Sequence, residues 1–322
     1  DGDFADHPQH HVVQAQNGHG RGELRDGFRR AAHQDFAEQL RIGPETARFA
    51  VLGQSLPHTW SPYIHNSLFD AAGLDAVYLP VTVPPERLGS VTDVFRSCFS
   101  GFNVTIPYKE KILPFLDDID EAAQVCGAVN TVEIRNGRMI GHITDGLGML
   151  RAIDEKGVET HQVDVLILGG GGAARVAGYA FLSRGGRVTF AVRDTQKGDA
   201  LAHALAKTQQ DGLRRLSVRP LADCAEAHDI LINCTPVGMY PHVDACPVSA
   251  DVIARCGAVF DAVYNPRETR LLTLARQNGL PAIEGLGMLF YQAVEAQKFW
   301  FGDRVASKAG QSRIYSELQT RL

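Results

Sequence analysis

The feature that most constrains this sequence is a run of four glycines, Gly169–Gly172, between an apolar strand predicted over 163–168 and an apolar helix. Read as Gly-x-Gly-x-x-Ala, the turn uses Gly169 for the tight reversal and Gly171 for close backbone approach to a pyrophosphate. Ala174 allows close packing of the helix on the strand. The helix N-terminus then offers free N–H groups to phosphates. The pattern predicts a dinucleotide-binding unit, and a glycine-rich turn without a ligand is the alternative.

Strand and helix patterns alternate on both sides of this turn. In the first half, GFNVTI at 101–106 is followed by a stretch expected to be helical from Tyr108 to Phe115. Two alternating runs flank Asn136-Gly137, a pair suited to the turn of a hairpin. Such alternation is typical of largely parallel sheets with helices on both faces. We therefore predict an α/β protein with a mostly parallel substrate domain and a Rossmann-like nucleotide-binding domain.

The length of 322 residues also favours two domains. Residues 1–46 are polar and rich in His and Gly at first, and they are predicted to form a flexible leader. A substrate-binding, catalytic domain is predicted over 47–147 and the nucleotide-binding domain over 148–287. The last long apolar helix is expected to pack back on the cleft, so that 288–322 complete the first domain.

Composition excludes several classes of partner. The formal net charge of −5 argues against nucleic acid and anionic membranes. No apolar run approaches the roughly 18 residues that span a bilayer. The first residues lack the basic start and apolar core of a secretory signal. The six cysteines form no CxxC pair, so reduced thiols, no metal site and a cytoplasmic location are predicted.

Cations after the second strand of the nucleotide-binding unit favour NADP over NAD. NAD sites usually place Asp or Glu at the end of that strand, where it binds the ribose 2′-hydroxyl. Here Val192 stands at that position, followed by Arg193 and, four residues later, by Lys197. Such cations suit the 2′-phosphate of NADP. Asp194 opposes this interpretation, since its carboxylate could repel a phosphate or bind a ribose, and the two cations could instead be solvated surface charges.

Polar residues gather in four segments of the first domain, several of them where a predicted strand ends. The segments are His58–Pro62, Asn103–Lys109, Gly127–Thr131 and Thr144–Gly146. Ligands of open α/β sheets bind at the carboxyl ends of strands, and converging hydroxyls and amides suit a small polyhydroxylated acid. Each residue also has a structural interpretation: Thr59 and Ser61 as helix caps ahead of Pro62, and Asn130 as a turn residue.

Eight segments, in order along the chain, resemble the shikimate dehydrogenase family. They are LGQSLPHTWSPYIHN, GFNVTIPYKE, GAVNT, ITDGLG, LGGGGAAR, NCTPVGMYP, FDAVYNPRET and GLGMLFYQA. The resemblance runs from about Phe49 to Gly302 and leaves the first 46 residues outside it. It implies a monomer or homodimer that reversibly reduces 3-dehydroshikimate to shikimate with NADPH, in chorismate and aromatic amino acid biosynthesis.

The resemblance also implies a role for each matched residue. Lys109 and Asp145 correspond to the catalytic pair. The substrate contacts correspond to Thr59, Ser61, Thr105, Asn130, Tyr264 and Gln292. The cofactor contacts correspond to Gly169, Gly170, Gly171, Gly172, Ala173, Arg193, Lys197, Ala262 and Gly285. The sequence departs from the family at Ile143, where Asn usually precedes Thr-Asp-Gly, and at Val192 and Asp194, where Asn-Arg-Thr is usual.

Oxidation of a secondary alcohol needs a hydride acceptor, a base for the hydroxyl proton and fixed geometry. NADP would be the acceptor, and Lys109 is the expected base. Two other functions stay open. One is a quinate/shikimate dehydrogenase with relaxed substrate and cofactor use. Thr59 argues mildly against it, because the family more commonly has Ser there and the additional methyl group of Thr leaves less room for the bulkier quinate. The other is a catalytically impaired homologue that senses the metabolite, against which the presence of both Lys109 and Asp145 argues.

Overall fold

The computed structural model describes residues 42–57, 59–207 and 211–321. The compact unit begins at Glu45. Most of the predicted leader, residues 1–41, lies outside the described residues. Thr46 already belongs to the compact unit, because it is buried and its hydroxyl donates to Asp75 Oδ1 at 2.7 Å.

The first sheet is mixed, with strand order β2-β1-β3-β5-β6-β4. The pairs β1–β2, β1–β3 and β4–β6 are parallel, while β3–β5 and β5–β6 are antiparallel. The expected hairpin joins β5 to β6 through Asn136 and Gly137, whose φ angles of 51° and 74° fit the turn. The elements of this lobe are β1 (Ala47–Gly53), α2 (Ser61–Ala71), β2 (Ala76–Thr82), η1 (Pro85–Arg87), α3 (Leu88–Cys98), β3 (Gly101–Val104), η2 (Leu113–Phe115), β4 (Asp118–Ile119), α4 (Glu121–Cys126), β5 (Thr131–Arg135) and β6 (Arg138–His142).

The second sheet is parallel throughout, with strand order β12-β11-β10-β7-β8-β9. The order reverses between β7 and β10, and this reversal is where open α/β sheets bind ligands. The elements are β7 (Asp164–Leu168), α6 (Gly172–Ser183), β8 (Arg187–Val192), α7 (Thr195–Ala206), η3 (Gly212–Arg215), β9 (Leu216–Pro220), η4 (Leu221–Asp223), β10 (His228–Asn233), α8 (Ala250–Ile253), β11 (Cys256–Asp261), α9 (Arg270–Gln277) and β12 (Ala282–Glu284).

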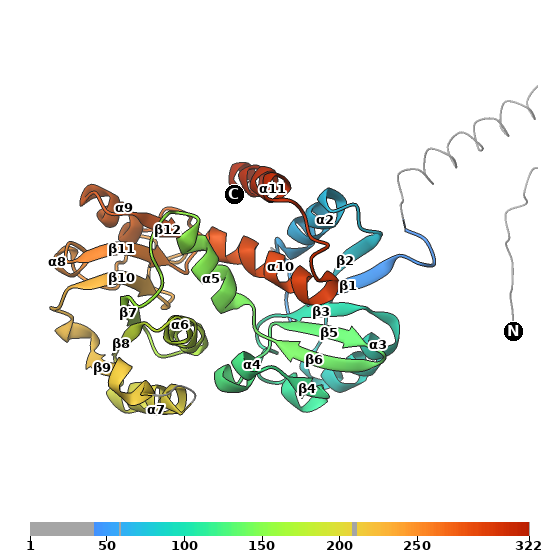
Figure 1. The fold of residues 1–322 in the computed structure, drawn as a ribbon, viewed down its shortest axis with the longest axis horizontal. Coiled ribbons are helices and arrows are strands. Elements are labelled where there is room, and N and C mark those ends of the chain that lie inside the picture. The colour runs from blue at the N-terminus through green and yellow to red at the C-terminus, as the bar shows by residue number, and fades with distance from the viewer. Residues whose placement is uncertain (1–41, 58, 208–210, 322) are drawn as a thin grey trace, which may run out of the picture. The chain divides into compact units, whose positions relative to one another are not determined.

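Two helices connect the sheets, α5 (Asp145–Asp154) and α10 (Gly285–Phe301), and they lie side by side between them (Figure 1). Helix α10 follows β12 of the second sheet, and near its end Trp300 Nε1 donates to the Val132 carbonyl of the first sheet at 3.0 Å. Helix α11 (Lys308–Arg321) then packs on α2. The predicted two-domain α/β fold is therefore confirmed, and the last long apolar helix, which was expected to return to the cleft, is α10.

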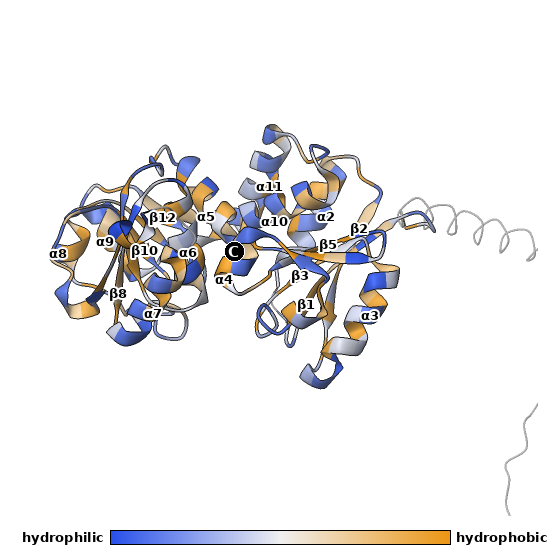
Figure 2. Cartoon of the chain, turned by 60° about the horizontal axis from the view of Figure 1, so that its bottom comes forward, coloured by the Kyte–Doolittle hydropathy of each residue, from blue (hydrophilic) through white to orange (hydrophobic). Residues whose placement is uncertain are grey.

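The cores explain which faces of the helices are apolar. Figure 2 shows hydrophobic and hydrophilic residues alternating along α3, whose buried residues Leu88 and Phe95 belong to the core of the first lobe. Helix α6 contributes to the cores of both lobes. Its Val176 belongs to the core of the first lobe, and Tyr179 packs against the cores of both. Helix α6 of the second lobe is thus also packed into the core of the first lobe.

The helix expected over 108–115 is wrong. These residues form turns followed by the short η2 segment. Pro114 lies inside the stretch and has no N–H for a helical hydrogen bond, which accounts for the interruption. Lys109 therefore stands in a turn.

No helix of the described residues is long and apolar enough to cross a membrane. All six cysteines are free thiols. Burial raises the pKa of the Cys126 and Cys234 thiols to about 12, so both are protonated at neutral pH.

A buried histidine on α2 makes stability sensitive to acid. The His65 ring stacks on Tyr78, with 4.1 Å between ring centroids, and its Nδ1 lies 3.3 Å from Gln297 Nε2. Burial lowers the pKa of His65 from 6.5 to about 3, because the charged imidazolium is penalised in an apolar setting. The folded protein thus keeps His65 neutral over a range in which the unfolded chain protonates it.

We expect the free energy of unfolding to fall as the pH drops from 6.5 towards 3, the interval between the two pKa values of His65. The contribution approaches roughly 1.4 kcal/mol per pH unit within this interval. His65→Phe keeps a flat ring against Tyr78 and removes the titration. Urea unfolding at several pH values should therefore give a shallower acid dependence for the variant. Equal slopes for the two proteins would contradict the assignment.

Candidate active site

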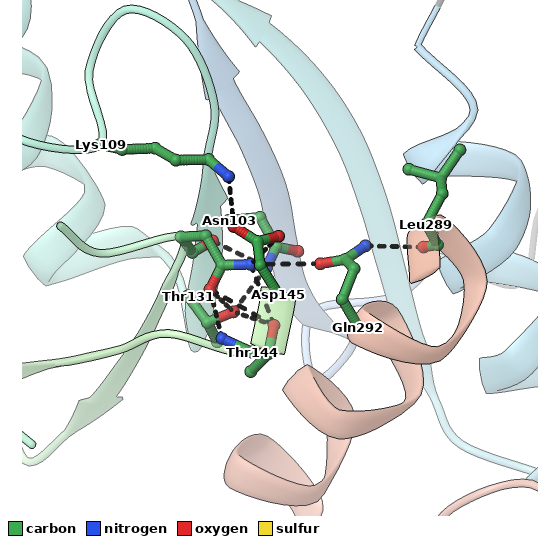
Figure 3. A network of polar contacts seen from close by, with 8 residues as sticks. Asn103, Lys109, Thr131, Thr144, Asp145, Leu289 and Gln292 are labelled. Atoms are coloured by element: carbon green, nitrogen blue, oxygen red, sulfur yellow. Dashed lines mark hydrogen bonds and ion pairs between the residues drawn. The ribbon is translucent and has the colours of Figure 1, made fainter. Parts of the chain in front are cut away.

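A lysine and an aspartate meet at the edge of the first sheet. Lys109 lies in the loop after β3, and Asp145 is the first residue of α5, just after β6. Lys109 Nζ lies 2.5 Å from Asp145 Oδ2, and the two side chains are 29% and 16% exposed (Figure 3). The pair is mostly enclosed yet open to a ligand, so the structure brings the two predicted catalytic residues together.

An amide fixes the other side of this carboxylate. Asn130 Nδ2 lies 3.0 Å from Asp145 Oδ1 and from Thr144 Oγ1, and 3.4 Å from Gln292 Oε1. Its Oδ1 accepts from the Thr144 N–H at 2.8 Å. Gln292 in turn donates to the Leu289 carbonyl at 2.9 Å. The carboxylate is therefore held between an ammonium group and an amide, with Gln292 of α10 in the same network (Figure 3).

A second buried amide supports the network from within the sheet. Tyr78 OH donates to Asn103 Oδ1 at 2.6 Å, and Asn103 Nδ2 donates to the Asn130 carbonyl at 3.0 Å and to Thr131 Oγ1 at 2.9 Å. Asn103 begins one of the predicted polar segments, but no individual contact was predicted for it. The available signal was a polar residue inside the otherwise apolar strand GFNV, because a buried amide is found where it has partners.

One cavity of about 260 Å³ joins predicted contacts from both lobes. Its lining includes Ser61, Thr105, Lys109, Asn130, Asp145, Ala173, Ala262, Tyr264, Gly285 and Gln292. Asn103, Met288 and Leu289 also line it and were not predicted. Most of the predicted substrate contacts therefore face the same space as three of the predicted cofactor contacts.

Thr59 lies in an adjoining cavity of about 720 Å³, which it shares with Ser61, Thr105 and Tyr264. The Thr59 hydroxyl accepts from the Ser61 N–H at 3.4 Å, a long contact. Thr59 therefore contributes little as a helix cap, and its oxygen can still accept from or donate to a ligand.

The glycine turn fits a dinucleotide. Gly169 follows β7 with φ 109°, a conformation that side chains rarely allow. No heavy atom lies within 4 Å of where a Cβ would stand on Gly171 or Gly172, so the backbone there is uncovered. The first turn of α6 carries no acidic side chain. Free N–H groups and the helix dipole are thus available to a pyrophosphate.

The loop after β11 brings the nucleotide lobe to the cavity. Asp261 is fully buried and accepts from the Val263 N–H at 3.0 Å, from Asn233 Nδ2 at 2.9 Å and from Thr269 Oγ1 at 2.6 Å. Burial raises the pKa of Asp261 above its usual value, and the three hydrogen bonds offset only part of this rise. The loop that bears Ala262 and Tyr264 is therefore fixed by a buried carboxylate at its root.

A cavity of about 740 Å³ in the second lobe is lined by Val192 and Arg193, together with mostly apolar residues between Pro220 and Ala222 and between Cys246 and Val252. Lys197 does not line it. Its ammonium lies 3.6 Å from Asp194 Oδ2 and its side chain is 85% exposed. Asp194 Oδ1 also accepts from the Lys197 N–H at 3.2 Å, as the cap of α7. Of the two predicted cations, only Arg193 lines this cavity.

Residues 51–132 match the family model for the shikimate dehydrogenase substrate binding domain. The shikimate dehydrogenase (NADP(+)) of Methanocaldococcus jannaschii is 39% identical over 264 residues, which are 81% of this chain and 93% of that protein. The shikimate dehydrogenase (NADP(+)) of Symbiobacterium thermophilum is 40% identical, over 79% of this chain and 88% of that protein. The chain belongs to the shikimate dehydrogenase family.

Solved structures of the family have the same fold. A shikimate dehydrogenase crystallised with NADP+ superposes with a TM-score of 0.79 at 36% identity, over 86% of this chain and 97% of that one. The shikimate 5-dehydrogenase of Thermus thermophilus, in complex with NADP(H) and shikimate, gives a TM-score of 0.75 at 34% identity, over 84% and 99% of the two chains.

Ile143, where the family's pattern usually has Asn, makes no hydrogen bond of the polar network through its apolar side chain. The Ile143 side chain is 5% exposed and packs in the core of the first lobe. The neighbouring Thr144 keeps its N–H on Asn130 Oδ1. The position that a shikimate dehydrogenase usually fills with Asn is thus an apolar core position in this chain.

Proposed function

We propose that this chain is an enzyme that interconverts shikimate and 3-dehydroshikimate, with NADP as the hydride carrier. The observation that carries the proposal is the Lys109–Asp145 pair, with 2.5 Å between Nζ and Oδ2. The pair lines the same cavity as Ala262 and Gly285 of the nucleotide lobe. This arrangement supports the removal of a proton and a hydride from neighbouring atoms of one ligand.

We assign the substrate carboxylate to Thr59, Ser61 and Tyr264. All three line the outer cavity, and each carries a hydroxyl that can donate. The outer cavity is the one of about 720 Å³ that Thr59 lines. We assign the ring hydroxyls to the inner cavity of about 260 Å³, where Asn130 and Gln292 offer amide groups. Thr105 lines both cavities, so it is placed to contact the ring between them.

The proposed proton transfer uses the paired side chains. In the oxidative direction, Lys109 acts as a neutral amine: its Nζ accepts the proton of the C3 hydroxyl as the C3–H bond breaks, and it becomes the ammonium that pairs with Asp145. In the reverse direction, this ammonium returns the proton. Asp145 holds the lysine head group in place through Oδ2, while Asn130 fixes Oδ1 and hence the plane of the carboxylate. When bound, NADP+ supplies the hydride acceptor.

The residues proposed to hold the cofactor are spread along the second lobe. The turn Gly169–Gly172 and the N-terminus of α6 would hold the pyrophosphate. Arg193 would meet the 2′-phosphate, because it alone of the two predicted cations lines the nucleotide cavity. Gly285 would border the nicotinamide. The backbone of Gly285 also lies close to the Ala262 backbone, because a Cβ on Gly285 would stand 2.6 Å from the Ala262 carbonyl oxygen. Only glycine permits this close approach.

A reduction assay tests the proposal. Shikimate or quinate is supplied with NADP+ or NAD+, and the absorbance of the reduced cofactor is followed. We expect the highest activity with shikimate and NADP+. Activity with quinate at a similar rate would favour the relaxed enzyme, and no activity with any pair would refute the proposal.

Asp194 offers a test of cofactor selectivity. Its carboxylate lies next to Arg193 in sequence and neutralises part of the Lys197 charge. Asp194→Asn keeps a good helix cap and removes the negative charge. We expect kcat/KM for NADP+ relative to NAD+ to rise about twofold to fivefold, as for an exposed charge pair. Asp199→Asn, on the exposed surface of the same helix, is the control, and an unchanged ratio in Asp194→Asn would contradict the prediction.

We further propose a cytoplasmic location, which the six free thiols support. The prediction of a monomer or homodimer is open to light scattering on the purified protein.

A further inference from the structure

The side chain of Arg175 connects the two lobes. Arg175 is the fourth residue of α6, the helix whose first turn is proposed to hold the cofactor pyrophosphate. Its Nη1 donates to the Cys126 carbonyl oxygen at 3.2 Å. Cys126 is the last residue of α4 in the substrate lobe. One guanidinium therefore links the start of a helix in one lobe to the end of a helix in the other.

The electrostatics of the two helices explain why the Arg175 side chain reaches from α6 to the end of α4. A cation near the N-terminus of its own helix is unfavourable, because that end of the helix dipole is positive. A helix C-terminus has carbonyl groups without intrahelical partners, and cations are favourable there. Arg175 thus gains its stabilisation from α4 rather than from α6.

The Cys126 carbonyl lies at the root of a segment that carries site residues. Gly127, the C-cap residue that follows α4, has φ 62°, and a Cβ on it would stand 3.2 Å from Arg175 Nη1. Two residues later, the Val129 N–H donates to the Lys109 carbonyl oxygen at 2.8 Å. Asn130 follows directly. A shift of the Cys126 carbonyl would therefore move both the backbone of Lys109 and the side-chain amide of Asn130, which orients Asp145.

Helix α6 also packs on the segment that bears Asp145. A Cβ on Gly146 would stand 3.1 Å from Val176 Cγ1 and 3.1 Å from Ala180 Cβ, so the two helices are in close contact. Helix α6 therefore contacts both chain segments that build the polar network, one through Arg175 and the other through Val176 and Ala180.

We propose that Arg175 is a positioning residue that fixes the segment Gly127–Asn130, and with it Lys109, relative to the cofactor helix. The proposal rests on the proposed function. It assigns Arg175 to the geometry of the substrate side, although the residue belongs to the nucleotide lobe. The competing role is direct binding of a cofactor phosphate, for which a cation beside the glycine turn is also suited.

Two substitutions separate these roles. Arg175→Met keeps the aliphatic stem and removes the hydrogen-bond donors, while Arg175→Lys keeps a cation. With NADP+ saturating, we expect Arg175→Met to lower kcat/KM for shikimate roughly tenfold, as for a charge-assisted hydrogen bond, and Arg175→Lys to restore part of it. The KM for NADP+ should change less than twofold. Arg313→Met, which removes an exposed arginine from α11, should match the wild type.

Calorimetric binding of shikimate to the cofactor-free protein gives a second readout. We expect weaker binding in Arg175→Met, an effect that no phosphate contact produces. A raised KM for NADP+ with normal shikimate binding would overturn the proposal, as would wild-type values throughout. If Arg175→Met fails to fold, Arg175→Lys decides alone, by whether shikimate or NADP+ parameters change. Lack of activity in the wild type would instead refute the proposed function.

Discussion

Lys109→Met is expected to lower kcat by more than about a hundredfold, the usual effect of losing a general acid–base group. The substitution keeps the unbranched stem and removes Nζ, which lies 2.5 Å from Asp145 Oδ2. The C3 hydroxyl then loses its proton acceptor, and Asp145 loses its cation. Because Asn130 still holds Asp145 Oδ1, we expect the KM for shikimate to change far less than kcat.

Steady-state kinetics with shikimate and NADP+ measure this effect. Lys111→Met is the matched control, since Lys111 stands two residues further along the same loop and is exposed. The control should retain wild-type turnover. Near-normal turnover in Lys109→Met would remove Lys109 from the proton transfer and would leave the role to another group of the cavity.

Gly148→Ala is expected to damage the site from a distance. A Cβ at this position would stand 2.5 Å from the backbone N of Gln292 and 2.8 Å from its Cα. These are backbone atoms of α10, so α5 and α10 must separate. Asp145 at the start of α5 and Gln292 on α10 would then move apart. Because a misplacement of about 1 Å costs on the order of a hundredfold in rate, we expect kcat/KM for shikimate to fall by about that factor.

Overpacking should also lower the stability of Gly148→Ala by about 1–3 kcal/mol. Thermal unfolding and kinetics measure the two effects together. Gly310→Ala is the control, because its Cβ would make ordinary contacts of 3.5 Å on another helix. The control should be neutral or slightly more stable, since Ala is the better helix former. Equal behaviour of the two variants would refute the close-packing argument.

The architecture was predictable because its signals are local. The glycine turn after an apolar strand and the Asn136-Gly137 hairpin depend on residues adjacent in sequence. The antiparallel pairing of β3 with β5 depends on which strands become neighbours, so it had no local signal. The same limit explains the missed Asn103, whose partners Tyr78 and Thr131 are 25 and 28 residues away.

The resemblance to a family indicated which residues correspond to site positions, but it could not predict which atoms their side chains contact. Lys197 matched a cofactor contact, yet its ammonium faces Asp194 because that carboxylate caps α7. Ile143 stands where the family usually has a polar Asn, yet it fills an apolar core position. In both cases the outcome depends on how a side chain packs against elements distant in sequence. The roles of individual site residues stay predictions that the variants above test.

The two glycines on α5, Gly146 and Gly148, limit how this helix can move. Without side chains at Gly146 and Gly148, this helix has no clearance from α6 on one side or from α10 on the other. Close-packed backbones slide or tilt only a little before atoms collide. The Asp145 carboxylate at the start of α5 and the glycine turn at the start of α6 are therefore expected to keep their relative positions if the two lobes move.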